Sequence, residues 1–275
     1  MRGTSNRNAF QVYVEGERLF SVISEADMKK SRACFAKATD LDPKFARAWG
    51  WRSYTTMRSI MVGWLPQTDG QKAADWAKKA VELDPNDYAT YWDLAFYQLN
   101  TGDFDKALKT YKKALDLYEN FTDWLDRKHG LLAEMAEAFI HVGKPKEAIA
   151  LLKRACRVPD WYKWNLGWAY FHAEDYASAA RCFEDLDLKP GDPRYVMETQ
   201  LFVAAAHLNK ADLDENAGNK QEATHSRGRA ERAMAALKKH QPKYSLQDAI
   251  AHRSKFKKGA ELKRWENTVR KLLAS

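Results

Sequence analysis

A phrase of about eleven residues that recurs along the chain is the feature that most constrains its fold. It reads "ACFAKATDLDP" up to Pro43, "DWAKKAVELDP" up to Pro85 and "KTYKKALDLYE" up to Glu119. Each copy places apolar residues three and four positions apart, which is one face of an α-helix. Proline cannot continue a helix, so the first two copies end there. The sequence therefore predicts an all-α fold of repeated helices that stop at regular points.

The spacing of the copies predicts helix pairs. Successive copies after Pro85 are offset by 41 and then 31 residues, close to the 34-residue period of a helix-turn-helix repeat, and the extra residues fall between helices, where such arrays tolerate insertions. We expect repeats over residues 1–242, at about 8–43, 46–85, 88–121, 129–159 and 160–190, with a degenerate copy at 194–242. Residues 243–275 lack the repeat, but Leu262, Trp265, Val269 and Leu272 share one helix face, which predicts a basic C-terminal capping segment.

On these residues the chain resembles the tetratricopeptide repeat (TPR) family. The family unit reads W-x2-L-G-x2-Y in its first helix and A-x3-F-x2-A, then Pro, around its second. The matching positions are Trp49, Ala73, Ala80 and Pro85; Leu94, Gly102, Phe104, Ala107, Tyr111 and Ala114; and Leu166, Gly167, Tyr170, Tyr176, Ala179 and Phe183. The resemblance implies a right-handed superhelix, or α-solenoid, of about five to six repeats, whose first helices line a concave groove.

A finer resemblance covers nearly the whole chain. The order of "AFQVYVEGERLF", "FAKATDLDPKFARAWGW", "PDWYKWNLGWAYFHAEDYASAARCFE" and "HQPKYSL" is similar to the C-terminal TPR region of proteobacterial class III adenylate/guanylate cyclases and of related winged-helix regulators. That likeness implies a bacterial signalling role beside an attached cyclase or DNA-binding domain. We find neither domain in this sequence, so only an interaction or regulatory role carries over.

The stretch "WYKWNLGWAYF" supplies the first candidate binding residues. Helical spacing separates it into a stripe for core packing, at Tyr162, Leu166, Gly167 and Tyr170, and a second stripe at Trp161, Trp164 and Trp168. In a TPR superhelix the second stripe faces the groove, where Trp92, Phe96 and Tyr54 hold equivalent places in neighbouring first helices. An aromatic groove suits a peptide or helix of a partner protein. The alternative is that these rings pack between neighbouring repeats.

The charged residues of the predicted groove indicate which charge its ligand carries. Some TPR adaptors of chaperones hold a C-terminal carboxylate with a clamp of Lys, Asn and Arg. Here the groove offers only Asn165 and Arg47, which is no clamp. Asp93, Glu134 and Glu137 are available to cations, so an apolar or partly basic ligand is favoured.

No site for catalysis, a metal or a cofactor is expected. The nucleotide-binding, zinc-protease and hydrolase motifs are absent, and no nucleophile and base pair stands out. His141, His172 and His207 end three successive first helices, but helices about 8–10 Å apart do not bring three imidazoles to one metal. The 3 cysteines lack zinc or disulfide spacing. We therefore expect a non-enzymatic protein that requires no cofactor.

The net charge of +8 comes from one part of the chain. Residues 220–275 hold 15 Lys and Arg against 5 Asp and Glu, a balance of +10, which leaves −2 for residues 1–219. The basic segment favours a solvated cap, with contact to an acidic protein, nucleic acid or lipid as alternatives. No apolar window reaches the roughly 18 residues that a membrane span needs, and the N-terminus lacks an apolar signal region, so a cytoplasmic location is expected.

Two functions remain open from the sequence. The first is a non-catalytic scaffold that binds a partner peptide or helix in the aromatic groove. The alternative is a regulatory or sensor domain that binds a small ligand or a neighbouring domain.

Overall fold

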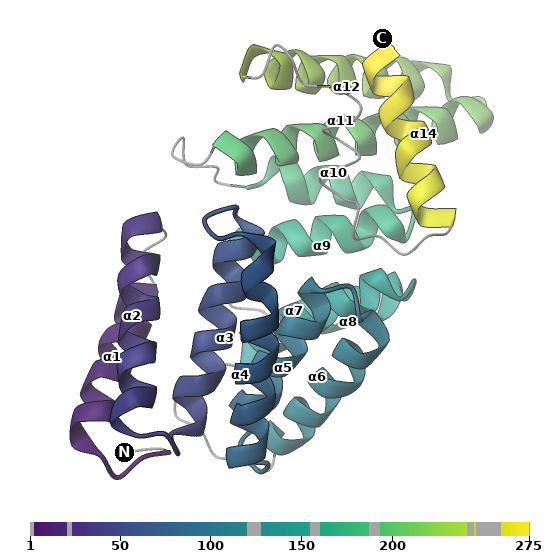
Figure 1. Ribbon diagram of the computed structural model, residues 1–275. Coiled ribbons are helices and arrows are strands. Elements are labelled where there is room, and N and C mark those ends of the chain that lie inside the picture. The colour runs from purple at the N-terminus through teal and green to yellow at the C-terminus, as the bar shows by residue number, and fades with distance from the viewer. Residues whose placement is uncertain are drawn as a thin grey trace. The chain divides into compact units, whose positions relative to one another are not determined.

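The computed structural model describes residues 3–20, 24–119, 128–154, 160–186, 193–240, 245 and 260–274, and these residues form helices and turns without a strand (Figure 1). In the first half of the chain the helices are α1 (Arg7–Phe20), α2 (Glu25–Leu41), α3 (Ala46–Met61), the short 3₁₀ helix η1 (Gln67–Asp69), α4 (Gly70–Leu83), α5 (Tyr88–Asn100) and α6 (Phe104–Glu119). They are followed by α7 (Lys128–His141), α8 (Pro145–Arg154), α9 (Asp160–His172), α10 (Tyr176–Glu184), α11 (Pro193–Asn216), α12 (Lys220–His240) and α14 (Ala260–Ala274). The all-α prediction is confirmed.

The helices fall into two compact units, residues 1–138 and 139–275. Within each unit, helices that are neighbours in sequence pack in pairs, as α1 with α2, α5 with α6 and α11 with α12. Such nearest-neighbour packing defines an α-solenoid. The division into individual repeats and the hand of a superhelix stay predictions.

Local sequence signals set the helix ends. Asp42 and Asp84 stand just before a proline and form the C-caps of α2 and α4. Ser24 caps the start of α2 by accepting a hydrogen bond from the backbone N–H of Asp27, and Asp87 caps α5 in the same way through Ala89. These side chains satisfy amide groups that a helix start leaves without a partner.

Alanines and one glycine let the helices of the first unit approach closely. Ala9, Ala38, Ala48, Ala73, Ala77, Ala95 and Ala107 are fully buried. A methyl group added at Gly16 of α1 would lie 2.9 Å from the ring of Phe35 in α2. Phe35 in turn packs edge-on against Tyr13, with ring centroids 5.6 Å apart. The core thus alternates small residues on one helix with rings on the next.

Aromatic side chains from four helices form the core of the second unit. Phe202 of α11 stacks on Trp265 of α14, with ring centroids 4.7 Å apart, and Phe171 of α9 and Phe183 of α10 pack edge-on or tilted against Phe202. Trp265, Val269 and Leu272 are buried, as the capping-helix prediction requires. The side chain of Leu262 and most of the basic segment after Pro242 lie outside the described residues.

Candidate functional site

The carboxyl group of Glu134 accepts hydrogen bonds from side chains on three other helices. Glu134 lies on α7 and is 4 % exposed. Its Oε1 accepts a hydrogen bond of 2.7 Å from the hydroxyl of Tyr54 on α3. Its Oε2 accepts bonds of 2.6 Å from the indole Nε1 of Trp92 on α5 and 3.1 Å from the hydroxyl of Tyr111 on α6. We call these four residues the Glu134 cluster.

Burial changes the protonation of this cluster. It raises the pKa of Glu134 to about 7, although the hydrogen bonds from Trp92, Tyr54 and Tyr111 lower it, and the nearby charge of Glu137 raises it further. Burial, together with the charge of Glu134, also raises the pKa of Tyr54 and of Tyr111 well above the ordinary tyrosine value. Both tyrosines are therefore neutral hydrogen-bond donors at neutral pH.

Two of the rings in this region keep part of their surface exposed. Tyr54 and Trp92 are half-buried, whereas Phe96 is buried. Phe96 stacks on Tyr54, with centroids 4.0 Å apart and planes tilted by 25°. The structure thus brings three predicted binding residues, Tyr54, Trp92 and Phe96, into one group on α3 and α5.

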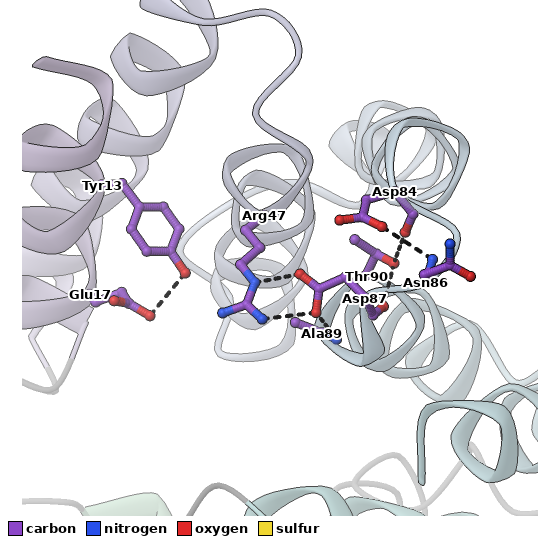
Figure 2. A network of polar contacts seen from close by, with 8 residues as sticks. All are labelled: Tyr13, Glu17, Arg47, Asp84, Asn86, Asp87, Ala89 and Thr90. Atoms are coloured by element: carbon purple, nitrogen blue, oxygen red, sulfur yellow. Dashed lines mark hydrogen bonds and ion pairs between the residues drawn. The ribbon is translucent and has the colours of Figure 1, made fainter. Parts of the chain in front are cut away.

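Arg47, a fourth predicted residue, is engaged inside the protein. Its Nε donates to Asp87 Oδ2, and its Nη2 donates to Oδ1 at 2.9 Å (Figure 2). Asp87 Oδ1 also accepts from the backbone N–H of Ala89 at the start of α5. Burial opposes the charge of Arg47, but the hydrogen bonds and charge of Asp87 raise its pKa. Arg47 therefore joins the start of α3 to the start of α5, and Asp87 neutralises its charge inside the protein.

The predicted residues of α9 belong to the second unit, and most of them lie in its core. Trp164 is 7 % exposed and Trp168 is fully buried at 0 %. Trp164 packs against Phe202, with centroids 5.4 Å apart, and Trp168 against His141, at 5.1 Å. Asn165 is also buried, and its Nδ2 has no hydrogen-bond partner among the described residues. The side chain of Trp161 lies outside the described residues.

The sequence did not indicate Tyr111 as part of the site, and it indicated Glu134 only as an acid open to cations. In the structure three neutral donors occupy the Glu134 carboxyl group. The available signal was the pair of glutamates, Glu134 and Glu137, inside the otherwise apolar run "LLAEMAEAF", because a buried carboxyl group needs hydrogen-bond donors nearby.

Metal ions and membranes have no visible site in the described part of the chain. No three His, Cys, Asp or Glu side chains within it come close enough to hold a metal. His207 instead pairs with Glu184, at 2.8 Å between Nε2 and Oε1. None of the helices that the structure describes combines the length and apolar content needed to cross a bilayer.

Two family models, both described as tetratricopeptide repeat, match residues 88–121 and 133–193. The chain therefore contains tetratricopeptide repeats in these two segments. The first match covers the α5 and α6 pair that carries Trp92 and Tyr111, and the second includes the α9 and α10 pair with Trp164 and Trp168. No curated protein sequence matches the chain.

Solved structures of other proteins share its fold at low sequence identity. PilW, a type IV pilus biogenesis factor, aligns with a TM-score of 0.58 and 16% identity, over 88% of this chain and 97% of PilW. YrrB, described as a TPR protein with an unusual peptide-binding site, gives 0.50 and 17%, over 76% of this chain and 93% of YrrB. Human IFIT1, solved as a dimer with m7Gppp-AAAA, gives 0.58 and 14%, over 97% of this chain and 72% of IFIT1. At these identities the likeness concerns the fold.

Proposed function

We propose that this TPR protein is a non-catalytic interaction module that binds a partner peptide or helix on the surface formed by Tyr54 and Trp92, with Phe96 behind them. We call this surface the aromatic groove. The observation that carries the proposal is the hydrogen bonding of both half-buried rings to the buried Glu134. TPR arrays are used as binding surfaces of this kind.

Fixed rings favour binding because they have little freedom left to lose. A tyrosine or tryptophan contributes roughly 150–250 Å² of contact surface. Ordering a mobile side chain at an interface costs about 0.5–1.5 kcal/mol. In Tyr54 and Trp92 the hydrogen bonds to Glu134 and the stacking of Phe96 on Tyr54 have already restricted the rings.

The polar residues around the groove favour an apolar or basic ligand over an acidic one. Arg47 is held by Asp87, so it does not offer a free cation to a carboxylate. Of the other acids in this region, Asp93 is buried and Glu137 is half-buried on α7. A basic side chain beside an apolar one would therefore complement this surface.

The experiment is a pull-down from a lysate of the source organism with wild type, Trp92→Ala and the control Trp49→Ala. Trp49 is also half-buried and lies in the first unit, and its indole donates to the carbonyl of Pro43 instead of Glu134. We expect the partner to be retained by wild type and the control and lost by Trp92→Ala, since interface tryptophans often contribute 2 kcal/mol or more. Circular dichroism verifies that each variant is folded. Equal retention by all three proteins would rule out the aromatic groove.

The α9 residues remain a separate part of the proposal. Trp161→Ala tests that ring in the same assay. The burial of Trp164 and Trp168 supports the alternative in which these two rings stabilise the second unit, and Asn165 is tested with Asn165→Ala.

The cyclase-type resemblance, an attached catalytic or DNA-binding domain and a cytoplasmic location also stay predictions. A sensor role would require a ligand or neighbouring domain that changes the activity of such an attached domain. Sequencing the native gene on both sides of this segment tests whether one is encoded there.

A further inference from the structure

A cationic cavity lies between α2, α3 and α4 of the first unit, apart from the residues of the aromatic groove. Its volume is about 320 Å³. Helix α2 contributes Lys29 and Arg32, α3 contributes Arg52, and α4 contributes Lys72 and Trp76. The long turn after α3 closes one side with Leu65 and Asp69. This turn is the insertion that lengthens the second repeat, so the cavity depends on a part of the chain outside the repeat pattern.

The lining carries an excess of positive charge. Four of its described residues are Lys or Arg and one is acidic, a balance of +3. That acid, Asp69, already pairs with Lys72 at 2.9 Å. The described carboxylates that favour the charged forms of Arg32 and Arg52, namely Asp69, Glu25 and Asp40, act through longer-range charge interactions. The two guanidinium groups are therefore left without an ion-pair partner in the described part of the chain.

Neutral contacts hold both guanidinium groups in place. Arg32 Nη1 donates to the hydroxyl of Ser59, and Arg52 Nη1 donates to the hydroxyl of Thr39 at 2.7 Å. A hydroxyl group positions a guanidinium without neutralising it, and each arginine has five N–H donors. Further donors therefore remain for another acceptor.

Tryptophan rings orient Arg52 further. Its Cζ lies 4.3 Å from the ring centroid of Trp76 and 4.9 Å from that of Trp49. Cation–π contacts of this kind stabilise the charge at its faces. Hydrogen bonds to an anion are made along the edge of the guanidinium plane.

The guanidinium groups of Arg32 and Arg52 are half-buried, so they have lost part of their hydration. Burial lowers the pKa of Arg32 and of Arg52, because water is removed from the charged form and no carboxylate replaces it. Both groups are still charged at neutral pH. An anion placed between them would restore the missing interaction.

We propose that this cavity binds a phosphate monoester, with Arg32, Arg52 and Lys29 as the ligand-binding residues. Arginine forks match the oxygen geometry of phosphate, and lysine adds a point charge. Small-molecule pockets begin at roughly 300 Å³, so the cavity admits the phosphate with a small organic group. The source is either a free phosphorylated metabolite or a phosphorylated serine or threonine of a peptide.

Calorimetric titration at constant ionic strength tests the proposal with inorganic phosphate, glycerol phosphate and a phosphoserine peptide beside its unphosphorylated form. Wild type is compared with Lys29→Gln/Arg32→Gln and with the control Lys30→Gln/Lys37→Gln. The control removes the same charge from the same helix but outside the cavity. Any binding by the basic segment after residue 220 is common to all three proteins, so the difference between the double variants isolates the cavity.

We expect at least a tenfold loss of affinity for the phosphorylated probes in Lys29→Gln/Arg32→Gln and less than a twofold change in the control. Tighter binding of glycerol phosphate would assign a metabolite as the source, and tighter binding of the phosphopeptide would assign a modified protein. Equal affinity in both double variants, or no phosphate-dependent binding to wild type, would overturn the proposal. If the first double variant does not fold, Lys29→Glu against Lys30→Glu makes the same comparison with two exposed residues.

Discussion

The indole Nε1 of Trp92 donates a 2.6 Å hydrogen bond to Glu134 Oε2, across 42 residues of sequence. One partner is a half-buried ring on α5 and the other a buried carboxyl group on α7. The position of a surface ring therefore depends on the protonation and packing of a group in the interior. This dependence makes the aromatic groove testable through Glu134 as well as through the rings themselves.

Glu134→Gln should make the stability of the protein less sensitive to pH. In the folded protein the pKa of Glu134 is raised from 4.5 to about 7, so between these values the folded state binds a proton that the unfolded state has lost. The wild type therefore loses free energy of unfolding as pH rises from about 5 to about 7. We expect Glu134→Gln to gain about 1–3 kcal/mol relative to wild type between pH 5 and pH 8.

Urea unfolding at the two pH values measures this difference. Glu82→Gln is the control, since Glu82 is an exposed glutamate of α4, and its difference from wild type should stay constant. A Glu134→Gln difference that is the same at pH 5 and pH 8 would show that this carboxyl group titrates alike in the folded and unfolded states.

Replacing Arg47 should be costly because its partner is buried. Arg47→Met leaves Asp87 without its ion-pair partner inside the protein. Removing one member of a buried pair costs about 3–5 kcal/mol. The matched control is Arg18→Met, since Arg18 also donates two hydrogen bonds to one carboxylate, Glu15, but on the exposed surface.

Thermal and urea unfolding compare the two variants with wild type, and Arg18→Met should be unchanged. Asp87→Asn adds a further check, because an asparagine keeps the cap of α5 but loses the charge. If Arg47→Met were as stable as Arg18→Met, the Arg47 and Asp87 pair would not hold α3 and α5 together.

Alanine should be tolerated at one helical glycine and not at two others. A Cβ atom at Gly16 or Gly167 would lie 2.9–3.0 Å from the rings of Phe35 and Phe183, respectively, whereas at Gly228 the nearest atom is 3.6 Å away. Overpacking lowers the free energy of unfolding by about 1–3 kcal/mol. The higher helix propensity of alanine over glycine raises it by about 1 kcal/mol. We expect a net loss for Gly16→Ala, a smaller loss for Gly167→Ala and a gain of up to about 1 kcal/mol for Gly228→Ala.

Chemical denaturation ranks the three variants. Gly167 and Gly228 lie in the same unit, so their comparison removes differences in overall stability between units. A stabilised Gly16→Ala would mean that α1 and α2 have room to separate.

Truncating Trp265 should loosen the second unit while sparing the first. The ring is 1 % exposed and stacks on Phe202. Replacing a buried tryptophan with alanine costs about 3–5 kcal/mol. Hydrogen exchange should show lost protection in α11 and unchanged protection in α3. Trp49→Ala, the half-buried control, should leave α11 protected, and protection of α11 that survives Trp265→Ala would exclude α14 as its cap.

The helix pairs were predictable because their signals are local. The 3.6-residue periodicity, the prolines after Asp42 and Asp84 and the Trp265, Val269 and Leu272 stripe all depend on near neighbours in sequence. The structure confirms the all-α repeat architecture for these reasons.

The site was less predictable because it depends on contacts between distant residues. Nothing near Glu134 in sequence says that Tyr54, Trp92 and Tyr111 will donate to it. For α9, the run "WYKWNLGWAYF" is apolar on most sides, with Lys163 exposed, and such a helix is covered on more than one face. The structure packs α9 against α8, α10 and α11, which explains the burial of Trp164 and Trp168.

The stacking of Trp265 on Phe202 also affects the order of events during synthesis. Helix α11 packs against its sequence neighbours α10 and α12, but the stacking of Phe202 on Trp265 also needs α14, which is made later. Trp265 follows Phe202 by 63 positions in the sequence, so at about 5–20 residues per second it appears roughly 3–13 s later. During that interval the face of Phe202 that stacks on Trp265 has no cover from α14.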